Sequence, residues 1–508
     1  VALPPVQMFD ADGIPNTKNI VSFSAISGET INIEDAYDSD QFDFSGTKIF
    51  DKGTGYRSKS LLTVPLKNSS DTVIGVLQLL NATDLDSGDI VPFSEEIQPL
   101  IEALASHAAV ALDNAILIAT QKNLLESFIE LMASAVDAKS PYTGGHCQRV
   151  PQLTEMLTHA ACDVTEGPFS DFSLDEDEWY ELHIGAWLHD CGKVTTPEYV
   201  VDKATKLETI TDRIHEVRAR FEIVKREAVI KCQEKIIEGG DSTELRAALD
   251  AQLKKIDEDY YFIAECNVGG EFMAAESIER VKQIAATKWV RTLDDRVGIA
   301  REELDRKGSE PVPQLPCEED LLADRKDHIF VHNAPVPSAD PDNPYGFKVD
   351  VPEHKFNKGE IYNLSIERGT LTAEERFMIN DHIVQTIVML ESLPFPKHLE
   401  NVPEIAGGHH EKMDGTGYPR RIRGETLSIP ARIMAIADVF EALTAADRPY
   451  KLSKTLSASI KIMSFMVKDS HLDGELFRLF LESGIYLDYA NKFLEPSQID
   501  EVLLQDYL

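Results

Sequence analysis

The chain has 508 residues, several times a typical domain length, so at least two hydrophobic cores are expected. Its composition, 43% hydrophobic and 27% charged, excludes collagen-like, low-complexity and wholly disordered classes. The 87 acidic residues outnumber the 50 basic ones and give a formal net charge of −37, which disfavours polymeric nucleic acids as partners. A small anionic ligand would therefore need a local basic pocket.

The cysteine content and the apolar runs favour a cytoplasmic protein. Six cysteines are scattered without a CxxC pair, which is untypical of a disulfide scaffold or a structural zinc knuckle. The richest apolar stretch, residues 97–120, contains Glu102, His107 and Asp113, so no uncharged run reaches the roughly 18 residues of a membrane helix. We expect no membrane span in this chain. Because the chain begins with Val1, we also expect that an upstream part is missing.

The first 95 residues predict a small domain that contains β structure. Short apolar runs at 20–23, 61–66 and 73–80 alternate with turn residues, and the last two runs predict a β-hairpin. From Glu95 to about Ala138 the apolar spacing is helical, which predicts a long helix that leaves this domain and enters the next. Such a helix could pair with its copy in a dimer or pack on its own domain.

Residues 201–355 are interpreted as an insertion between two helical parts. Charged amphipathic segments at 207–237 and 243–267, separated by Glu-Gly-Gly-Asp, predict a helical hairpin. Prolines crowd residues 307–344, which predicts extended or loop structure there. The hairpin could cap a pocket, bridge a dimer or decorate the surface, and the last two roles are favoured.

Histidines and carboxylates gather in five helix-compatible segments on either side of residues 201–355. The segments are Thr143–His146, Trp187–Lys193, Leu371–Ile387, Gly407–Pro419 and Ile433–Lys451. Together they supply seven side chains of metal-ligating type: His146, His189, Asp190, His382, His409, His410 and Asp438. Adjacent pairs such as His189-Asp190 are expected on helices, where neighbouring side chains project about 100° apart and can reach two ions. Two metal ions are therefore implied.

Imidazole and carboxylate ligands without a thiolate suit Fe, Mn, Zn, Ni or Co better than Ca or Mg. A single histidine on an apolar helix is usually a core or capping residue, and Asp438 could be a buried carboxylate with a backbone partner. However, the N–H groups around Asp438 in the middle of a helix are already used by the preceding turn. Burying this carboxylate unpaired would cost several kcal/mol, so a cation is the better partner.

Four motifs resemble the HD-GYP branch of the HD metal-dependent phosphohydrolases. They are HDCGK at 189–193, HH at 409–410, DGTGYP at 414–419 and ADVFEALTAADRPYK at 437–451. The resemblance covers roughly residues 121–200 and 356–500. It implies a helical bundle that holds metal ions at its centre and hydrolyses cyclic di-GMP to pGpG or GMP.

The resemblance also implies a role for each matching residue. His146, His189, Asp190 and Asp438 would hold one ion and His382, His409 and His410 the other, with Asp190 bridging the two. Fe or Mn is favoured, and Zn, Ni or Co stays open. Lys193 would lie beside the scissile phosphate, with Asp190 and Lys193 the catalytic pair. The remaining substrate contacts would come from four residues: Tyr418 and Pro419 on the base side, and Arg448 and Lys451 at the phosphates.

Two further positions bear on this assignment. His215 competes with His382 as a ligand, but the residues that follow His382 match the family better. Tyr142 stands where family members with a third metal carry a glutamate, which favours a centre of two metals.

Residues 51–66 and 73–84 resemble the second half of a GAF domain. Two positions differ from the nucleotide-binding GAF pattern, since the sequence has Asn81-Ala82 and, later, Phe93 followed by Ser-Glu-Glu. No ligand can be named for this domain. The expected fold is thus an α+β multidomain chain: a GAF-like α/β domain at 1–115, a connecting helix at 116–140, an all-α HD-GYP bundle at 141–200 and 356–508, and the mainly helical insertion at 201–355.

The expected function is a phosphodiesterase that hydrolyses cyclic di-GMP through a hydroxide activated by two metals. Cyclic di-GMP is favoured by the resemblance alone, and the same metals could act on 3′,3′-cyclic GMP-AMP. A different class of function is a non-hydrolytic receptor that signals to a partner such as a diguanylate cyclase. Retention of all seven ligand-type residues disfavours the receptor. A homodimer through the connecting helix is expected.

Overall fold

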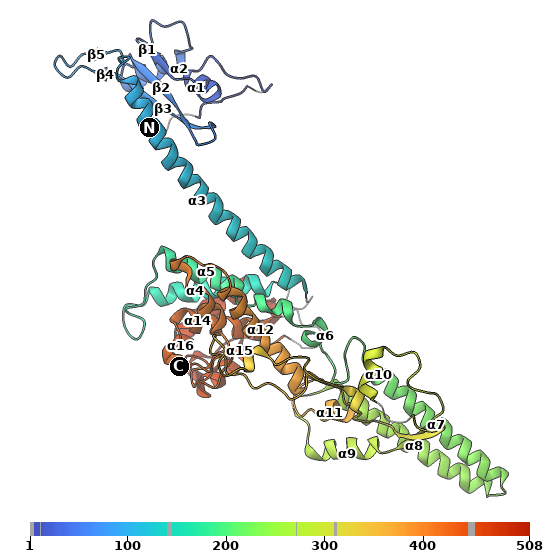
Figure 1. The fold of residues 1–508 in the computed structure, drawn as a ribbon. Coiled ribbons are helices and arrows are strands. Elements are labelled where there is room, and N and C mark those ends of the chain that lie inside the picture. Colours follow the sequence, from blue (N-terminus) through green and yellow to red (C-terminus); the bar gives the residue numbers. More distant parts are fainter. Residues whose placement is uncertain are drawn as a thin grey trace. The chain divides into compact units, whose positions relative to one another are not determined.

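The computed structural model describes residues 5–10, 12–139, 145–270, 272–308, 312–445 and 453–507. It divides into two units, Val1–Phe128 and Ile129–Leu508 (Figure 1).

The first unit is built on a three-stranded antiparallel sheet in the order β1-β2-β3. Its elements are α1 (Ile20–Ser27), β1 (Ile31–Ile33), α2 (Ser45–Thr54), β2 (Leu61–Lys67), β3 (Val73–Leu80), β4 (Ala82–Thr83), β5 (Ile90–Val91) and the start of α3 (Gln98–Lys139). Strands β2 and β3 pair from Leu61↔Leu80 onwards, which confirms the predicted hairpin. Leu62 and Val64 of β2 pack with Ala105 of α3, so the helix closes this core.

The strand-like interpretation of residues 20–23 is wrong, because these residues begin α1. The side-chain oxygen of Asn19 accepts hydrogen bonds from the N–H groups of Val21 and Ser22, at 3.0 and 3.1 Å. Gly28, with φ of 69°, ends the helix in the left-handed conformation. A four-residue apolar run does not distinguish helix from strand, and here the two caps decide.

The long helix is confirmed as α3, of 42 residues. Many of its large apolar side chains are exposed, among them Leu100, Leu104, Ile116, Leu117, Leu124 and Phe128. It is also the one helix among the described residues that is long and apolar enough to cross a membrane by length and composition, with 11% of the relevant window buried. A single such helix is a weak indication, since helices of soluble proteins pass the same test.

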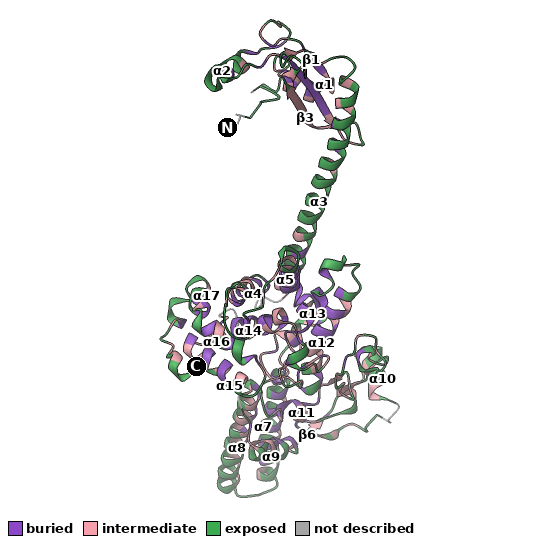
Figure 2. Cartoon of the chain, turned by 90° about the vertical axis from the view of Figure 1, so that its left-hand side faces the viewer, coloured by how far each residue is buried: buried purple, intermediate pink, exposed green. Residues whose placement is uncertain are grey.

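The second unit contains a helical bundle. Its elements are α4 (His146–Cys162), α5 (Glu176–Leu188), η1 (Cys191–Thr195), α6 (Glu198–Val201), α11 (Glu360–Leu364), α12 (Ala373–Glu391), η4 (Lys397–Leu399), α13 (Val402–Gly407), η5 (Gly424–Thr426), α14 (Ile429–Thr444), α15 (Leu456–Lys468), α16 (Gly474–Glu482), α17 (Ile485–Phe493), η6 (Pro496–Gln498) and η7 (Leu504–Asp506). Buried residues of α4 and α14–α17, such as Leu153, Phe440, Phe480 and Tyr489, form its main core (Figure 2).

Residues 201–355 form a lobe with its own small core. Its elements are α7 (Ile214–Ile237), α8 (Ser242–Val268), α9 (Ala275–Ala285), β6 (Lys288–Arg291), α10 (Arg301–Lys307), β7 (Cys317–Asp320), η2 (Lys326–His328), β8 (Ile329–Phe330) and η3 (Pro337–Ala339); β9 (Phe356–Asn357) follows directly and pairs with β8. Helices α7 and α8 pack together through residues such as Phe221 and Ile263, which confirms the predicted helical hairpin. The proline-rich stretch is not wholly irregular, because β7 pairs with β6.

Candidate metal centre

The seven predicted ligand-type side chains meet at the centre of the bundle. His146 begins α4, His382 lies in α12 and Asp438 lies in α14. His189 and Asp190 follow α5, and His409 and His410 follow α13. His382 is buried at the centre, whereas its rival His215 is exposed on α7.

We expected the adjacent pairs to lie inside helices. They lie instead just beyond helix ends. The last carbonyl groups of a helix have no partner within it, and histidine side chains bind them here. The Nδ1 atoms of His189 and His409 lie 2.7 Å from the carbonyl oxygens of Ala186 and Ala406. The turn after each helix thus fixes one ring and lets the next residue diverge from it.

Three of the histidines share one orientation. The Nδ1 atoms of His189, His382 and His409 lie 2.7, 2.5 and 2.7 Å from the backbone carbonyl three residues earlier. A carbonyl oxygen can only accept, so Nδ1 carries the proton in the neutral ring. The Nε2 atom then carries no proton, and its lone pair is directed to the centre. This is the form of the imidazole that ligates metals.

Asp190 lies between two groups of histidines. Its Oδ2 atom is 3.0 Å from Nε2 of His146 and 3.3 Å from Nε2 of His189, and its Oδ1 atom is 3.3 Å from Nε2 of His382. Asp438 adds a second carboxylate, with Oδ1 3.4 Å from Nε2 of His146. Such a gathering of lone pairs is stable when a positive charge is shared among them.

The residues present fit a pair of divalent cations. Ligand atoms of His146, His189 and Asp190 lie within 4.8 Å of one another, and those of His382, His409 and His410 do the same. Within this centre, two buried atoms, Oδ1 of Asp190 and Nε2 of His409, have no hydrogen-bond partner among the described residues. Buried polar atoms are normally satisfied, so orphaned acceptors at this point favour cations.

The protonation states of Asp438 and His409 agree with this fit, whereas the charge of Glu441 outweighs burial and raises the pKa of His146. Burial would raise the pKa of Asp438, but its hydrogen bond with His146 and the charges of neighbouring histidines hold it far below its usual range. Burial lowers the pKa of His409 to about 4. Ionised carboxylates and neutral imidazoles are the forms that metal binding requires.

Lys193 contacts Oδ2 of Asp190 directly. Burial would lower the pKa of this lysine, but the Asp190 carboxylate outweighs burial and raises it. Lys193 is therefore a fixed cation, and its side chain is 27% exposed. It can meet an anionic ligand that enters from solvent.

The loop at 414–419, here called the GYP loop, lies beside His382, His409 and His410. The Tyr418 ring stacks on His410, with ring centroids 4.9 Å apart. Buried Glu411 accepts from the N–H groups of Arg420 and Ile422, at 2.7 and 2.9 Å, and so holds the loop that contains Pro419. Arg448, Lys451 and Tyr142 lie outside the described residues.

Sequence reasoning missed Glu441, which orients His146. Its Oε2 atom lies 2.5 Å from Nδ1 of His146, and its Oε1 atom accepts from Nε of Arg149 at 2.7 Å. Burial opposes ionisation, but the charges of His146 and Arg149 lower the pKa of Glu441 to about 2. Its place three residues after Asp438 in an apolar helix, on the same face, is the signal that could have found it.

Sequence reasoning also missed the tight packing of Gly192 on α12. The Gly192 N–H donates to Oγ1 of Thr386 at 2.9 Å, and that hydroxyl donates to the His189 carbonyl. A Cβ atom at Gly192 would lie 1.9 Å from the His382 carbonyl oxygen. Only glycine lets the HD motif approach His382 this closely.

Replacing Gly192 by alanine should push η1 away from α12 and separate Asp190 from His382. We expect a loss of about 1–3 kcal/mol in the free energy of unfolding, because overpacking forces the backbone to shift. Bound metal should fall as well. Thermal unfolding and metal analysis would measure both, with Gly270→Ala as the control, since nothing lies within 4 Å of a Cβ there. Equal behaviour of the two variants would contradict this interpretation.

The last turn of α3 contacts the segments that carry two of the predicted ligands. The amine of Lys139 donates to the backbone carbonyls of Lys193, at 3.0 Å, and Val194. The Asp137 carboxylate accepts from the N–H group of Gly145 at 3.1 Å, directly before His146. One helix end therefore holds both the start of α4 and the end of the HD motif.

Comparisons with known proteins identify two domains. Residues 6–112 match the GAF domain model, and residues 316–476 match the HD domain model. The HD match includes His382, His409, His410 and Asp438, and it begins within the 201–355 segment. The chain therefore contains a GAF domain followed by an HD domain, as the motifs predicted.

Curated relatives match shorter stretches. The chain is 46% identical over 116 residues to 3′3′-cGAMP-specific phosphodiesterase 1 of Vibrio cholerae, covering 23% of this chain and 26% of the relative. It is 33% identical over 151 residues to a probable cyclic di-GMP phosphodiesterase of Vibrio cholerae, covering 28% and 34%. It is 38% identical over 105 residues to a cyclic di-GMP phosphodiesterase of Pseudomonas aeruginosa, covering 20% and 25%. The chain thus spans between 25% and 34% of the length of these relatives.

Proposed function

We propose that this chain, in which a GAF domain precedes an HD domain, is an HD-GYP phosphodiesterase that hydrolyses a cyclic dinucleotide. The observation that carries the proposal is the position of Asp190 between two sets of histidines. One carboxylate placed to touch two cations is the arrangement that two-metal phosphoester hydrolysis needs. The names of the relatives supply the substrate class.

His146, His189, Asp190 and Asp438 would hold one cation, and His382, His409 and His410 the other. When bound, two divalent cations lower the pKa of water and neutralise charge on phosphoryl oxygens. Fe or Mn is proposed from the imidazole and carboxylate donors, with Zn, Ni or Co open. Burial raises the pKa of the nearby Cys191 thiol to about 11 and also raises that of Cys147, so both thiols are protonated at neutral pH without a metal.

The chain's own residues bind and orient the substrate. Lys193, cationic and partly exposed beside Asp190, would neutralise a non-bridging phosphate oxygen. Tyr418 and Pro419 would shape the base side of the site. We propose phosphate contacts for Arg448 and Lys451 on the resemblance alone.

Cyclic di-GMP is the proposed substrate and 3′,3′-cyclic GMP-AMP the second candidate, since relatives of both kinds match the chain. Purified protein loaded with Mn²⁺ or Fe²⁺ should hydrolyse one of them to a linear dinucleotide or mononucleotides, measured by liquid chromatography. Binding of either dinucleotide without turnover by the metal-loaded protein would instead favour the receptor. Neither binding nor turnover would contradict both functions.

We propose that residues 201–355 interrupt the HD-GYP domain and that the expected domain boundaries hold. Contacts join this segment to the bundle at two places. Buried Lys203 donates to both carboxylate oxygens of Glu375, at 3.0 and 2.7 Å, near the start of the helix that carries His382. The N–H group of Lys348 donates to the Pro419 carbonyl at 2.7 Å.

We propose a cytoplasmic homodimer in which α3 pairs with its copy. The exposed apolar side chains of α3 provide the contact surface. A diguanylate cyclase remains a proposed further partner. Sedimentation of the full chain should give twice the monomer mass, and Leu117→Glu/Leu124→Glu should shift the protein to the monomer. A monomeric wild type across the micromolar range would contradict the proposal.

The end of α3 should also affect catalysis through Lys139. Lys139→Met removes the amine that donates to the backbone carbonyls of Lys193 and Val194. The backbone of Lys193 is then no longer held in place. We expect kcat to fall about 10-fold, in the range found for groups that orient metal ligands, with KM little changed. Lys139→Arg should restore much of kcat, because a guanidinium can reach the same carbonyls. An unchanged kcat in Lys139→Met would show that this contact does not position the site.

A further inference from the structure

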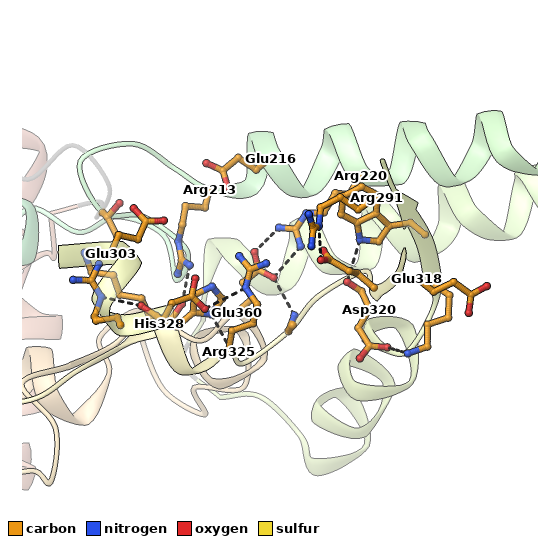
Figure 3. A pocket seen from close by; sticks show the side chains of 18 of the residues that line it. Arg213, Glu216, Arg220, Arg291, Glu303, Glu318, Asp320, Arg325, His328 and Glu360 are labelled. Carbon is orange, nitrogen blue, oxygen red and sulfur yellow. Dashed lines mark hydrogen bonds and ion pairs between the residues drawn. The ribbon is translucent and has the colours of Figure 1, made fainter. Parts of the chain in front are cut away.

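A cavity of about 710 Å³ lies in the 201–355 lobe (Figure 3), and none of the predicted metal ligands lines it. Helix α7, strands β6 and β7, helix α10 and the segment from η2 to β8 line it, together with residues 358–360. Its lining is rich in charged side chains of both signs.

Several cations of this cavity are neutralised by carboxylates. Arg220 donates to Oε2 of Glu360 at 3.0 Å, and Lys288 lies 2.6 Å from Asp320. Arg291 pairs with Glu319 at 2.6 Å. These pairs hold the lobe together.

Three other cations have no carboxylate within ion-pairing distance among the described residues: Arg213, Arg306 and Lys358. Arg213 donates only to backbone carbonyls, those of Leu207 at 3.2 Å and Lys358 at 2.7 Å. The Arg306 guanidinium lies 4.1 Å from the centroid of the Phe330 ring, and the Lys358 amine lies 4.9 Å from the same centroid. One aromatic ring thus holds two cations close together.

These cations repel one another. Burial, followed by the charges of Arg213 and Arg306, lowers the pKa of Lys358. Burial and the Arg325 charge lower the pKa of His328 to about 4, so this histidine adds no positive charge at neutral pH. In a chain with a formal net charge of −37, such a concentration of unpaired positive charge is unusual.

The nearby carboxylates do not neutralise this group. Asp327 lies 3.0 Å from the Lys307 amine, and Glu360 is engaged by Arg220. Glu216 also lines the cavity but is exposed to solvent, and in Figure 3 Arg213 descends from the start of α7 towards His328. Glu303, at the wall formed by α10, lines the cavity together with Arg306.

We propose that Arg213, Arg306 and Lys358 form a binding site for a small polyanion of the phosphate class, a pyrophosphate or a phosphate ester. Three cations match a ligand with two or more negative charges, and guanidinium groups bind phosphate oxygens in pairs. The site uses none of the residues of the metal centre, so this proposal can be tested independently of the proposed hydrolysis.

Calorimetric titration of the metal-loaded 508-residue chain with pyrophosphate tests the site. We expect saturable binding that persists in Asp190→Asn and weakens at least tenfold in Arg306→Gln/Lys358→Gln. Glu303→Gln should bind more tightly, because it removes an opposing charge that lines the cavity with Arg306. Lys288→Gln is the matched control and should bind as the wild type does, since this lysine lines the same cavity but is paired with Asp320.

Three results would overturn the proposal. One is that pyrophosphate shows no saturable binding to the wild type beyond the binding that chloride shows at equal ionic strength. Another is binding that disappears in Asp190→Asn but persists in Arg306→Gln/Lys358→Gln, which would assign the pyrophosphate to the metal centre. The third is a wild type that binds no pyrophosphate together with a double variant that unfolds at a lower temperature than the wild type. The three cations would then be purely structural.

Discussion

Asp190→Asn should lower hydrolysis of the cyclic dinucleotide by several orders of magnitude and reduce the bound metal to less than one equivalent. The Asp190 carboxylate faces His146 and His189 with one oxygen and His382 with the other. An asparagine keeps the shape of the side chain but loses the charge and presents an N–H₂ group to one set of ligands. Both cation positions are therefore weakened by one substitution.

Metal analysis and turnover should be measured on the same preparation, with thermal unfolding to show that the variant folds. Asp171→Asn is the matched control, because it makes the same chemical change at an exposed position. If Asp190→Asn retained both metals and full turnover, the bridging role of Asp190 would be refuted.

Glu441→Gln should lower metal affinity about 10- to 100-fold, the range seen when a group that orients a metal ligand is replaced. The Glu441 carboxylate fixes the ring of His146 from the side opposite Asp190 and also binds Arg149. Its loss leaves Arg149 without this buried partner. We therefore expect a second effect, a loss of about 3–5 kcal/mol in the free energy of unfolding, as for other broken buried ion pairs.

The two effects are separable by experiment. Excess metal should restore much of the turnover of Glu441→Gln but little of its lost thermal stability. Glu425→Gln, at an exposed position, is the control. A variant with normal metal affinity and lowered stability would reduce Glu441 to a structural residue.

The sequence was sufficient to predict most of the centre because five of the seven ligand-type residues lie in short motifs, whereas His146 and His382 lie outside them. HDCGK, HH and DGTGYP are local patterns, and in the structure the His189 ring lies against His409 and the Tyr418 ring stacks on His410. The helical hairpin and the long helix α3 were predictable because apolar periodicity extends over many turns. That these residues bind metals stays a prediction.

The rest depends on contacts between segments far apart in the chain. Glu441 is significant only because α14 packs against α4, where His146 begins. The need for glycine at Gly192 arises from the carbonyl of His382, nearly 200 residues later. The cation cluster of the 201–355 lobe combines Arg213, Arg306 and Lys358, which share no motif. Residues 20–23 were mistaken for a strand because so short a run carries no clear period.

Anomalous X-ray diffraction from crystals of the Mn- or Fe-loaded protein, recorded at the absorption edge of the metal, addresses the proposed centre most directly. Two peaks should appear about 3.5–4 Å apart, the spacing of two-metal sites, one on each side of the Asp190 carboxylate. One should lie among His146, His189 and Asp438 and the other among His382, His409 and His410. A single peak, or two peaks that do not share Asp190, would contradict the two-metal centre.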